Sequence, residues 1–197
     1  MDSRLAHPLT CIVSGSTGSG KSVSTLKLIE HAQEIISPPP ERILFCYDDY
    51  QKIFDNYPGV EFHDGWPEVS SFDGKKRTLL VMDDLMTSTD DRVVDIYTKI
   101  SHHRNLSVVY LTQNLIYKNK QTRKLSLNSH YIVLFKNAHD ETKVANLARQ
   151  IYPGKNAFMI EAFKNATSAP YGYLLIDLKQ ATDDKLRLRT GIFPGDV

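Results

Sequence analysis

The eight residues GSTGSGKS, at positions 15–22, constrain the fold more than any other part of this sequence. They fit the pattern G-x-x-x-x-G-K-S/T, with Gly15, Gly20, Lys21 and Ser22 at the defining positions. The apolar run TCIVSG precedes the pattern, and the helical run KSVSTLKLIEHAQEII follows it. The sequence therefore predicts a strand, a glycine-rich loop and a helix. The dinucleotide pattern G-x-G-x-x-G is not met, because Val23 stands where its third glycine belongs.

This loop has the chemistry of a nucleoside triphosphate site. Its backbone N–H groups can face phosphates, and the helix N-terminus adds a favourable dipole. Lys21 would compensate charge near the β and γ phosphates and so act in catalysis, while the Ser22 hydroxyl can ligate magnesium. We therefore expect ATP and Mg²⁺ as cofactors. The residues expected to bind ATP are Gly15, Ser16, Thr17, Gly18, Ser19, Gly20, Lys21 and Ser22.

Short apolar runs separated by helices predict an α/β fold. The runs RILFCY, TLLVM, SVVYLT and YIVLF are typical of buried strands, and RVVDIYTKISHH and DETKVANLARQIY are typical of helices. This alternation predicts a three-layer α/β/α domain with a mostly parallel central sheet. Residues 48–77 predict only short helices and loops. GYLLIDL and KLRLRT predict two more strands, from about residue 171, as an extension of one domain that spans residues 1–197.

The first helix should show one apolar face. Val23, Leu26, Ile29 and Ala32 recur at intervals of three residues, and we expect them on the same side of the helix. The segment SPPP, at 37–40, ends the helix because proline lacks the backbone donor and clashes with the preceding turn.

Two acid pairs follow predicted strands. In LLVMDDL, Asp83 would hold magnesium and Asp84 would orient or deprotonate the attacking water. The alternative is that they are solvated acids that cap the next helix. FCYDDY repeats the arrangement with Asp48 and Asp49. We assign the role to Asp83 and Asp84, because four apolar residues lead into them and the loop strand lies upstream.

Two polar residues flank the strand SVVYLT. Gln113 follows it, and ligands of open α/β sheets lie at the carboxyl ends of strands, so Gln113 could sense the γ-phosphate or the water. Arg104 precedes the strand and could stabilise charge at a neighbouring subunit's γ-phosphate. The alternatives are a loop glutamine and a solvated surface arginine.

The composition is typical of a folded globular protein, and the net charge shows that the chain as a whole is not strongly basic. Hydrophobic residues make up 41% of the chain and charged residues 24%, and the net charge is +1, so any polyanion must bind to local clusters. Cys11 and Cys46 lie in apolar runs, which predicts buried reduced thiols. Neither a signal peptide nor a membrane span is predicted, so we expect a soluble intracellular protein.

Several segments together resemble one family. They are GSTGSGKS, LLVMDD, SHHRNLSVVYLTQN, SLNSHYIVLFKN, LARQIYPG and PYGYLLIDL, and the resemblance extends from Ile12 to about Pro194. The sequence resembles the genome-packaging ATPases of the FtsK/HerA superfamily, in particular the short forms of Polinton (Maverick) elements and related large DNA viruses.

This resemblance implies a motor. It implies an additional strand between the loop strand and the Asp83 strand, a homo-oligomeric ring with active sites between subunits, and ATP-driven movement of double-stranded DNA into a capsid. By match to the family's motifs, Lys21 would bind phosphate, and Ser22 and Asp83 would bind magnesium. Asp84 would act on the attacking water, and Gln113 would sense the nucleotide. Arg104 would act at the active site of the neighbouring subunit. Many members carry Glu where Asp84 stands, and Asp is one methylene shorter.

The resemblance also implies partners and a location. A capsid or portal component and double-stranded DNA are expected, without a membrane, in the host nucleus, at a cytoplasmic assembly site or with the virion. DNA could contact the segment YKNKQTRK through Lys118, Lys120, Arg123 and Lys124, although a solvated basic loop is an equal interpretation. Arg187 and Arg189, expected on one face of a terminal strand, are a second candidate.

Two other functions stay open. A small-molecule kinase, acting on nucleosides or nucleotides, has a phosphate loop in a domain of this length, but it would need an arginine-rich lid that is not evident in the sequence. A nucleotide-regulated assembly subunit would bind ATP and scarcely hydrolyse it.

Overall fold

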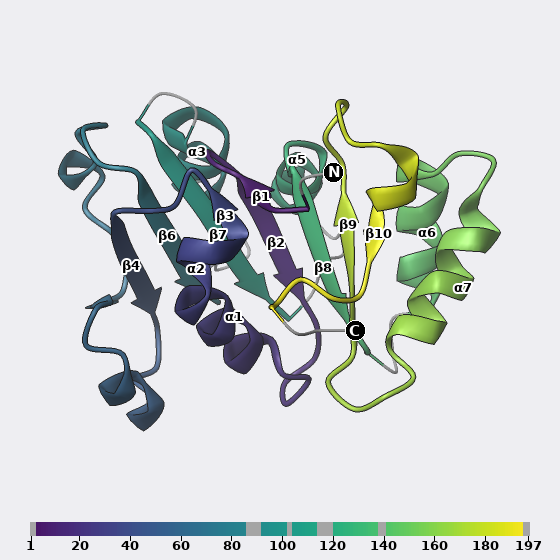
Figure 1. Cartoon of the computed structure of the whole chain (residues 1–197), viewed down its shortest axis with the longest axis horizontal. Helices are drawn as coiled ribbons and strands as arrows, with labels where there is room; N and C mark the ends of the chain where they lie inside the picture. Colours follow the sequence, from purple (N-terminus) through teal and green to yellow (C-terminus); the bar gives the residue numbers. More distant parts are fainter. Residues whose placement is uncertain (1–2, 86–91, 102–103, 114–119, 138–140, 195–197) are drawn as a thin grey trace.

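The computed structural model describes residues 3–85, 92–101, 104–113, 120–137 and 141–194. Its main feature is an eight-stranded sheet with the strand order β10-β9-β8-β2-β7-β6-β4-β5 (Figure 1). The strands are β2 (Thr10–Ser14), β4 (Arg42–Tyr47), β5 (Glu61–Asp64), β6 (Thr78–Asp83), β7 (Leu106–Thr112), β8 (Tyr131–Phe135), β9 (Tyr173–Asp177) and β10 (Leu188–Arg189). A separate two-stranded sheet pairs β1 (Leu5–Ala6) with β3 (Ile36–Ser37).

The sheet is parallel from β8 to β5 and antiparallel at β9 and β10. The parallel strands all end at the same edge, which gathers their carboxyl ends. The strand β7 lies between β2 and β6 and pairs with both. The expected α/β class and the expected additional strand are therefore confirmed.

Helices cover both faces of the sheet. One face is covered by α1 (Lys21–Glu30) and α2 (Ala32–Ile35), and the other by α3 (Arg92–Asp95), the π-helix Ile96–Ile100, α5 (Lys120–Leu127), α6 (Glu141–Ile151) and α7 (Asn156–Ala166). Neighbouring strand residues alternate between the two cores: Cys11 and Val13 pack with α1, whereas Ile12 packs with the opposite helices. This alternation explains why the central strands are apolar on both sides.

The first helix differs from the sequence prediction at its start. Leu26, Ile29 and Ala32 are buried as expected, but Val23 is 65% exposed. Residues three apart on a helix fall about 60° short of a full turn, so Val23 lies roughly half a turn from Ala32. The expected common face is therefore wrong for Val23. The helical segment ends before the proline run, as expected.

Three further elements differ from the prediction. Residues 48–77 contain the edge strand β5 besides the 3-10 helices Lys52–Asn56 and Val69–Ser71, and its mostly exposed sequence EFHD carries little apolar signal. The helix α7 was not predicted. The last strand, β10, is only Leu188–Arg189, so the expectation that Arg187 and Arg189 share one strand face is wrong.

Both cysteines are free and fully or nearly fully buried, as expected. Burial raises the pKa of the Cys11 thiol and of the Cys46 thiol to about 12, which keeps both protonated at neutral pH. Within the described ranges, no helix has the length and apolar character needed to cross a membrane.

Candidate functional site

The glycine-rich loop joins β2 to α1 at the carboxyl edge of the sheet. Gly18 and Gly20 have φ values of 76° and 99°, a region that side-chain-bearing residues rarely adopt. A Cβ added to Gly15 would lie 2.6 Å from Ser19 Oγ and 2.7 Å from Phe135 Cβ. The loop therefore needs glycine at these three positions, for conformation at two and for space at the third.

The Lys21 side chain folds back into the loop. Its Nζ donates to the carbonyl oxygen of Gly15 at 2.6 Å and to that of Ser16 at 3.0 Å, and the residue is only 9% exposed. Burial lowers the pKa of Lys21, and the carboxylates of Asp83 and Asp84 oppose this effect. The ammonium is thus held at the loop by backbone carbonyls, with two acids nearby to stabilise its charge.

Ser22 and Asp83 approach each other across the sheet edge. Ser22 Oγ donates to Asp83 Oδ2 at 3.4 Å. Burial and the neighbouring Asp84 raise the pKa of Asp83, while Lys21 and Ser22 act in the opposite direction. A hydroxyl and a carboxylate are the hard oxygen ligands that Mg²⁺ prefers, usually together with substrate phosphates and water. Ser22 and Asp83 are therefore residues that would hold an Mg²⁺ ion, which would help to neutralise the charge of bound phosphates.

Among the residues that the structure describes, no group of three or more His, Cys, Asp or Glu side chains is arranged to hold a metal. An ion at Ser22 and Asp83 would need further oxygen ligands, such as phosphate oxygens and water, to complete its coordination.

Gln113 connects the loop to the second acid. Its Nε2 donates to Asp84 Oδ2 at 2.8 Å, and its Oε1 accepts from Thr17 Oγ1 at 3.3 Å. Asp84 has a left-handed backbone with φ 53°, and its N–H donates to the Leu111 carbonyl oxygen at 3.3 Å. The ends of β2, β6 and β7 are thus joined by one chain of hydrogen bonds, Thr17 to Gln113 to Asp84.

These groups border one pocket of about 320 Å³, to which the end of β4 also contributes. Because β4 and β6 are adjacent and parallel, with Tyr47 opposite Asp83, both acid pairs reach the same edge. The sequence assignment set Asp48 and Asp49 aside. The only sequence signal for them was the repeated DD after two apolar runs, and it is the adjacency of β4 and β6 that brings them to this pocket. The pocket is lined by Thr17, Gly18, Lys21, Ser22, Tyr47, Asp48, Asp49, Gln51, Asp83, Asp84 and Gln113.

Arg104 lies at the other end of β7 from Gln113. Its Nη1 donates to the carbonyl oxygens of Val69 and Phe72, both at 2.9 Å. The seven residues of β7 separate it from the pocket by more than about 20 Å. The structure therefore does not bring Arg104 to the phosphate loop of its own chain.

The expected DNA-contacting residues are only partly described. Lys118 and the side chain of Lys120 lie outside the described residues, whereas Arg123 and Lys124 are exposed on α5. Arg187 and Arg189, the second candidate for DNA contact, both form ion pairs within this chain. Arg187 pairs with Asp184 at 2.8 Å, and Arg189 pairs with the buried Asp177 at 3.4 Å.

Comparison with known proteins adds to this geometry. No protein-family model matches this sequence, and no curated protein does either. Among solved structures, the genome packaging NTPase B204 from Sulfolobus turreted icosahedral virus 2, in complex with AMP, matches with a TM-score of 0.54 at 14% identity, covering 96% of this chain and 98% of that chain. This chain has a P-loop NTPase fold.

Two further structures agree with this fold assignment. The same NTPase in complex with ATP-gammaS matches with a TM-score of 0.54 at 15% identity, covering 92% of this chain and 96% of that chain. B204, the DNA-packaging ATPase from Sulfolobus turreted icosahedral virus, matches with a TM-score of 0.55 at 13% identity, covering 90% and 94%. The expected likeness to a genome-packaging ATPase is confirmed at the level of the fold.

Proposed function

We propose that this chain is an ATPase that hydrolyses MgATP and uses the energy to move double-stranded DNA into a viral or virus-like capsid. The observation that carries the ATPase part is the hydrogen-bonded chain from Thr17 through Gln113 to Asp84, which couples the phosphate loop to an acid suited to handle water. The DNA part rests on the fold shared with packaging NTPases and on the resemblance of the sequence segments.

Five side chains of the pocket, together with the N–H groups of the loop, have a chemical role in this proposal. The loop N–H groups and Lys21 hold the β and γ phosphates, and Ser22 and Asp83 hold the magnesium ion. Bound Mg²⁺ would supply a Lewis acid that neutralises charge on the phosphate oxygens. Asp84 orients the attacking water and accepts its proton. Gln113 holds the Asp84 carboxylate in a fixed position relative to the loop through its hydrogen bonds.

The proposal extends to partners. A homo-oligomeric ring would bring Arg104 of one subunit toward the γ-phosphate bound by the next, and a capsid or portal component would anchor the ring. Arg123 and Lys124 on α5 are the described candidates for contact with the DNA backbone.

Steady-state ATP hydrolysis at low salt, with and without linear double-stranded DNA, tests the proposal. We expect DNA to stimulate hydrolysis and Lys21→Ala to abolish it, while Lys164→Ala, which removes an exposed lysine of α7, leaves the rate unchanged.

Other outcomes identify the alternatives. ADP release coupled to phosphorylation of added nucleosides or nucleotides would establish a kinase. Tight ATP binding with negligible turnover, with or without DNA, would establish an assembly subunit.

A further inference from the structure

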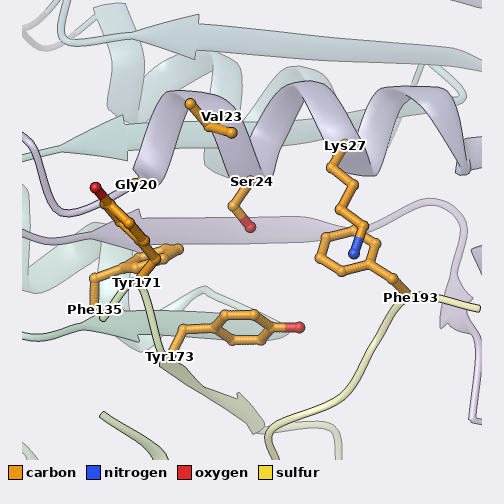
Figure 2. Close-up of a pocket in the computed structure, with 8 residues that line it drawn as sticks. All are labelled: Gly20, Val23, Ser24, Lys27, Phe135, Tyr171, Tyr173 and Phe193. Carbon is orange, nitrogen blue, oxygen red and sulfur yellow. The ribbon is translucent and has the colours of Figure 1, made fainter. Parts of the chain in front are cut away.

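A second pocket, of about 400 Å³, borders the phosphate loop at Gly20 (Figure 2). One wall is the first turns of α1, and the opposite wall consists of the aromatic rings of Phe135, Tyr171, Tyr173 and Phe193. Its volume lies within the range of small-molecule sites. We call it the aromatic pocket. None of the roles assigned above to the phosphate loop and the acids uses these four rings.

The segment before β9 holds Tyr171 in an unusual conformation. Tyr171 has φ 61°, which is uncommon for a bulky residue, and it is 72% exposed. The next residue, Gly172, is in close contact with α7 and the turn after it, because an added Cβ would lie 2.3 Å from the Ala166 carbonyl oxygen and 3.1 Å from that of Ala169. The fold thus maintains backbone strain that presents an apolar ring to solvent, and such strain clusters at functional sites.

The Tyr171 ring lies directly beside the phosphate loop. A Cβ added to Gly20 would lie 3.1 Å from Tyr171 Cδ1 and 3.6 Å from Phe135 Cε1. Gly20 is the residue at which the phosphate loop enters α1, so this ring is next to the backbone that would carry the phosphates. Val23, the exposed residue that departs from the predicted apolar face, lines the same pocket.

The order of the strands determines the direction in which a bound triphosphate extends. Its γ end must face Ser22 and Asp83, and the strands β7 and β6 lie on that side of β2. The strands β8 and β9 lie on the other side of β2. The nucleoside of such a triphosphate would therefore extend toward β8 and β9, the side on which Phe135, Tyr171 and Tyr173 line the aromatic pocket.

We propose that the aromatic pocket holds the nucleoside of the triphosphate, with the Tyr171 ring stacked on the base. This inference rests on the proposed nucleotide-binding function of the phosphate loop. Stacking of a base on an aromatic side chain tolerates different bases, because every base has a π-face.

The polar groups of the pocket point to recognition by stacking more than by hydrogen bonds to the base edge. Its polar side-chain atoms come from Ser24, Lys27, Tyr171 and Tyr173. The Lys27 ammonium lies 4.3 Å from the centroid of the Phe193 ring, and the Tyr173 hydroxyl accepts from the Ile192 N–H at 3.3 Å. We therefore expect ATP and GTP to bind with similar affinity, and both to bind more tightly than pyrimidine nucleotides with their smaller rings.

Calorimetric titration of ATP, GTP, CTP and inorganic tripolyphosphate tests the inference. The proteins are the wild type, Tyr171→Ala, Tyr171→Phe and the control Phe158→Ala, which removes an aromatic ring of α7 that is 59% exposed and does not line the pocket. We expect Tyr171→Ala to weaken the binding of ATP and GTP about tenfold or more and to leave the affinity for tripolyphosphate unchanged. Tyr171→Phe and Phe158→Ala should match the wild type.

The outcomes separate this inference from the proposed function. Unchanged ATP affinity in Tyr171→Ala, equal losses for ATP and tripolyphosphate, or a preference of more than a hundredfold between ATP and GTP would overturn the stacking proposal, while the phosphate loop would still bind triphosphate. Failure of folded wild-type protein to bind any of the four ligands would instead overturn the proposed nucleotide binding itself.

Discussion

Asp84 and Asp49 follow neighbouring strands and border the same pocket, so the catalytic role of each acid has to be decided residue by residue. The Gln113 amide donates to Asp84 and so connects it to the loop that would hold the γ-phosphate. This contact distinguishes Asp84 by its position in the structure, whereas the sequence distinguished it by the apolar run before it, the loop strand upstream and the match to the family's motif. Its assignment as the residue that handles water stays a prediction.

We expect Asp84→Asn to bind ATP with wild-type affinity and to hydrolyse it about a hundredfold more slowly or worse, because the amide cannot accept the proton of the attacking water. Asp49→Asn should stay within about threefold of the wild-type rate, a change too small for a lost general base. Single-turnover hydrolysis and equilibrium ATP binding measure both. If Asp49→Asn were inactive and Asp84→Asn active, the two acid pairs would have exchanged roles.

Asp83 makes stability depend on pH in a defined direction. Burial and Asp84 raise its pKa in the folded protein, so the folded state binds this proton more tightly than the unfolded chain does. Asp83 therefore destabilises the nucleotide-free protein above its folded pKa and has no effect below its unfolded pKa. We expect Asp83→Asn to raise Tm by about 2 °C or more at pH 7. This increase in Tm should become smaller as pH falls toward the ordinary pKa of an Asp carboxyl, about 3.9. A lower Tm at pH 7, without nucleotide, would contradict this.

At the scale of elements, local patterns predicted most of the structure, and their failures have physical causes. The strand, loop and helix around residues 10–30 follow from apolar periodicity and glycine spacing. The strand β5 escaped prediction because an exposed edge strand needs little apolar sequence. Arg187 lies outside β10 because the segment before it forms a 3-10 turn, where Arg187 pairs with Asp184.

The turn between α7 and β9 offers a test at this scale. An added Cβ at Gly172 would collide with backbone carbonyl oxygens, whereas Gly59 has nothing within 4 Å. We expect Gly172→Ala to lower the free energy of unfolding by about 1–3 kcal/mol, the usual cost of overpacking. Gly59→Ala should be neutral or stabilise by up to about 1 kcal/mol. Denaturant unfolding measures both, and equal stabilities of the two variants would contradict the tight contact.

At the scale of the whole molecule, the position of Arg104 has a consequence for assembly. It lies at the amino end of β7, at the opposite edge of the sheet from the loop, so it cannot reach the triphosphate of its own chain. A catalytic Arg104 would have to act on a neighbouring subunit. That residues 1–197 form one domain, and that they assemble as a ring, stay predictions.

Mixing two inactive variants tests action between subunits. Arg104→Ala lacks the donated arginine and Lys21→Ala lacks a working loop, so a mixed ring should recover hydrolysis at sites that combine an intact loop with an intact arginine. Steady-state ATP hydrolysis across mixing ratios measures this recovery. Tm of Arg104→Ala is the control, because this variant also loses two hydrogen bonds to carbonyl oxygens. Absence of recovery in verified mixed rings would argue against Arg104.

The sequence by itself determined the phosphate loop, the apolar strands around it and the polar residues that end those strands. These features depend on neighbours in the chain, through backbone sterics, glycine freedom and the periodicity of apolar side chains. Only the tertiary structure decided that Asp48 and Asp49 border the same pocket as Asp83 and Asp84, and that Thr17, Gln113 and Asp84 are bonded. It alone brought Gly20, Phe135 and Tyr171 together as the aromatic pocket. These contacts between distant segments depend on the order of strands in the sheet. That order is selected by the burial of both sheet faces at once, so no local segment of the sequence determines it.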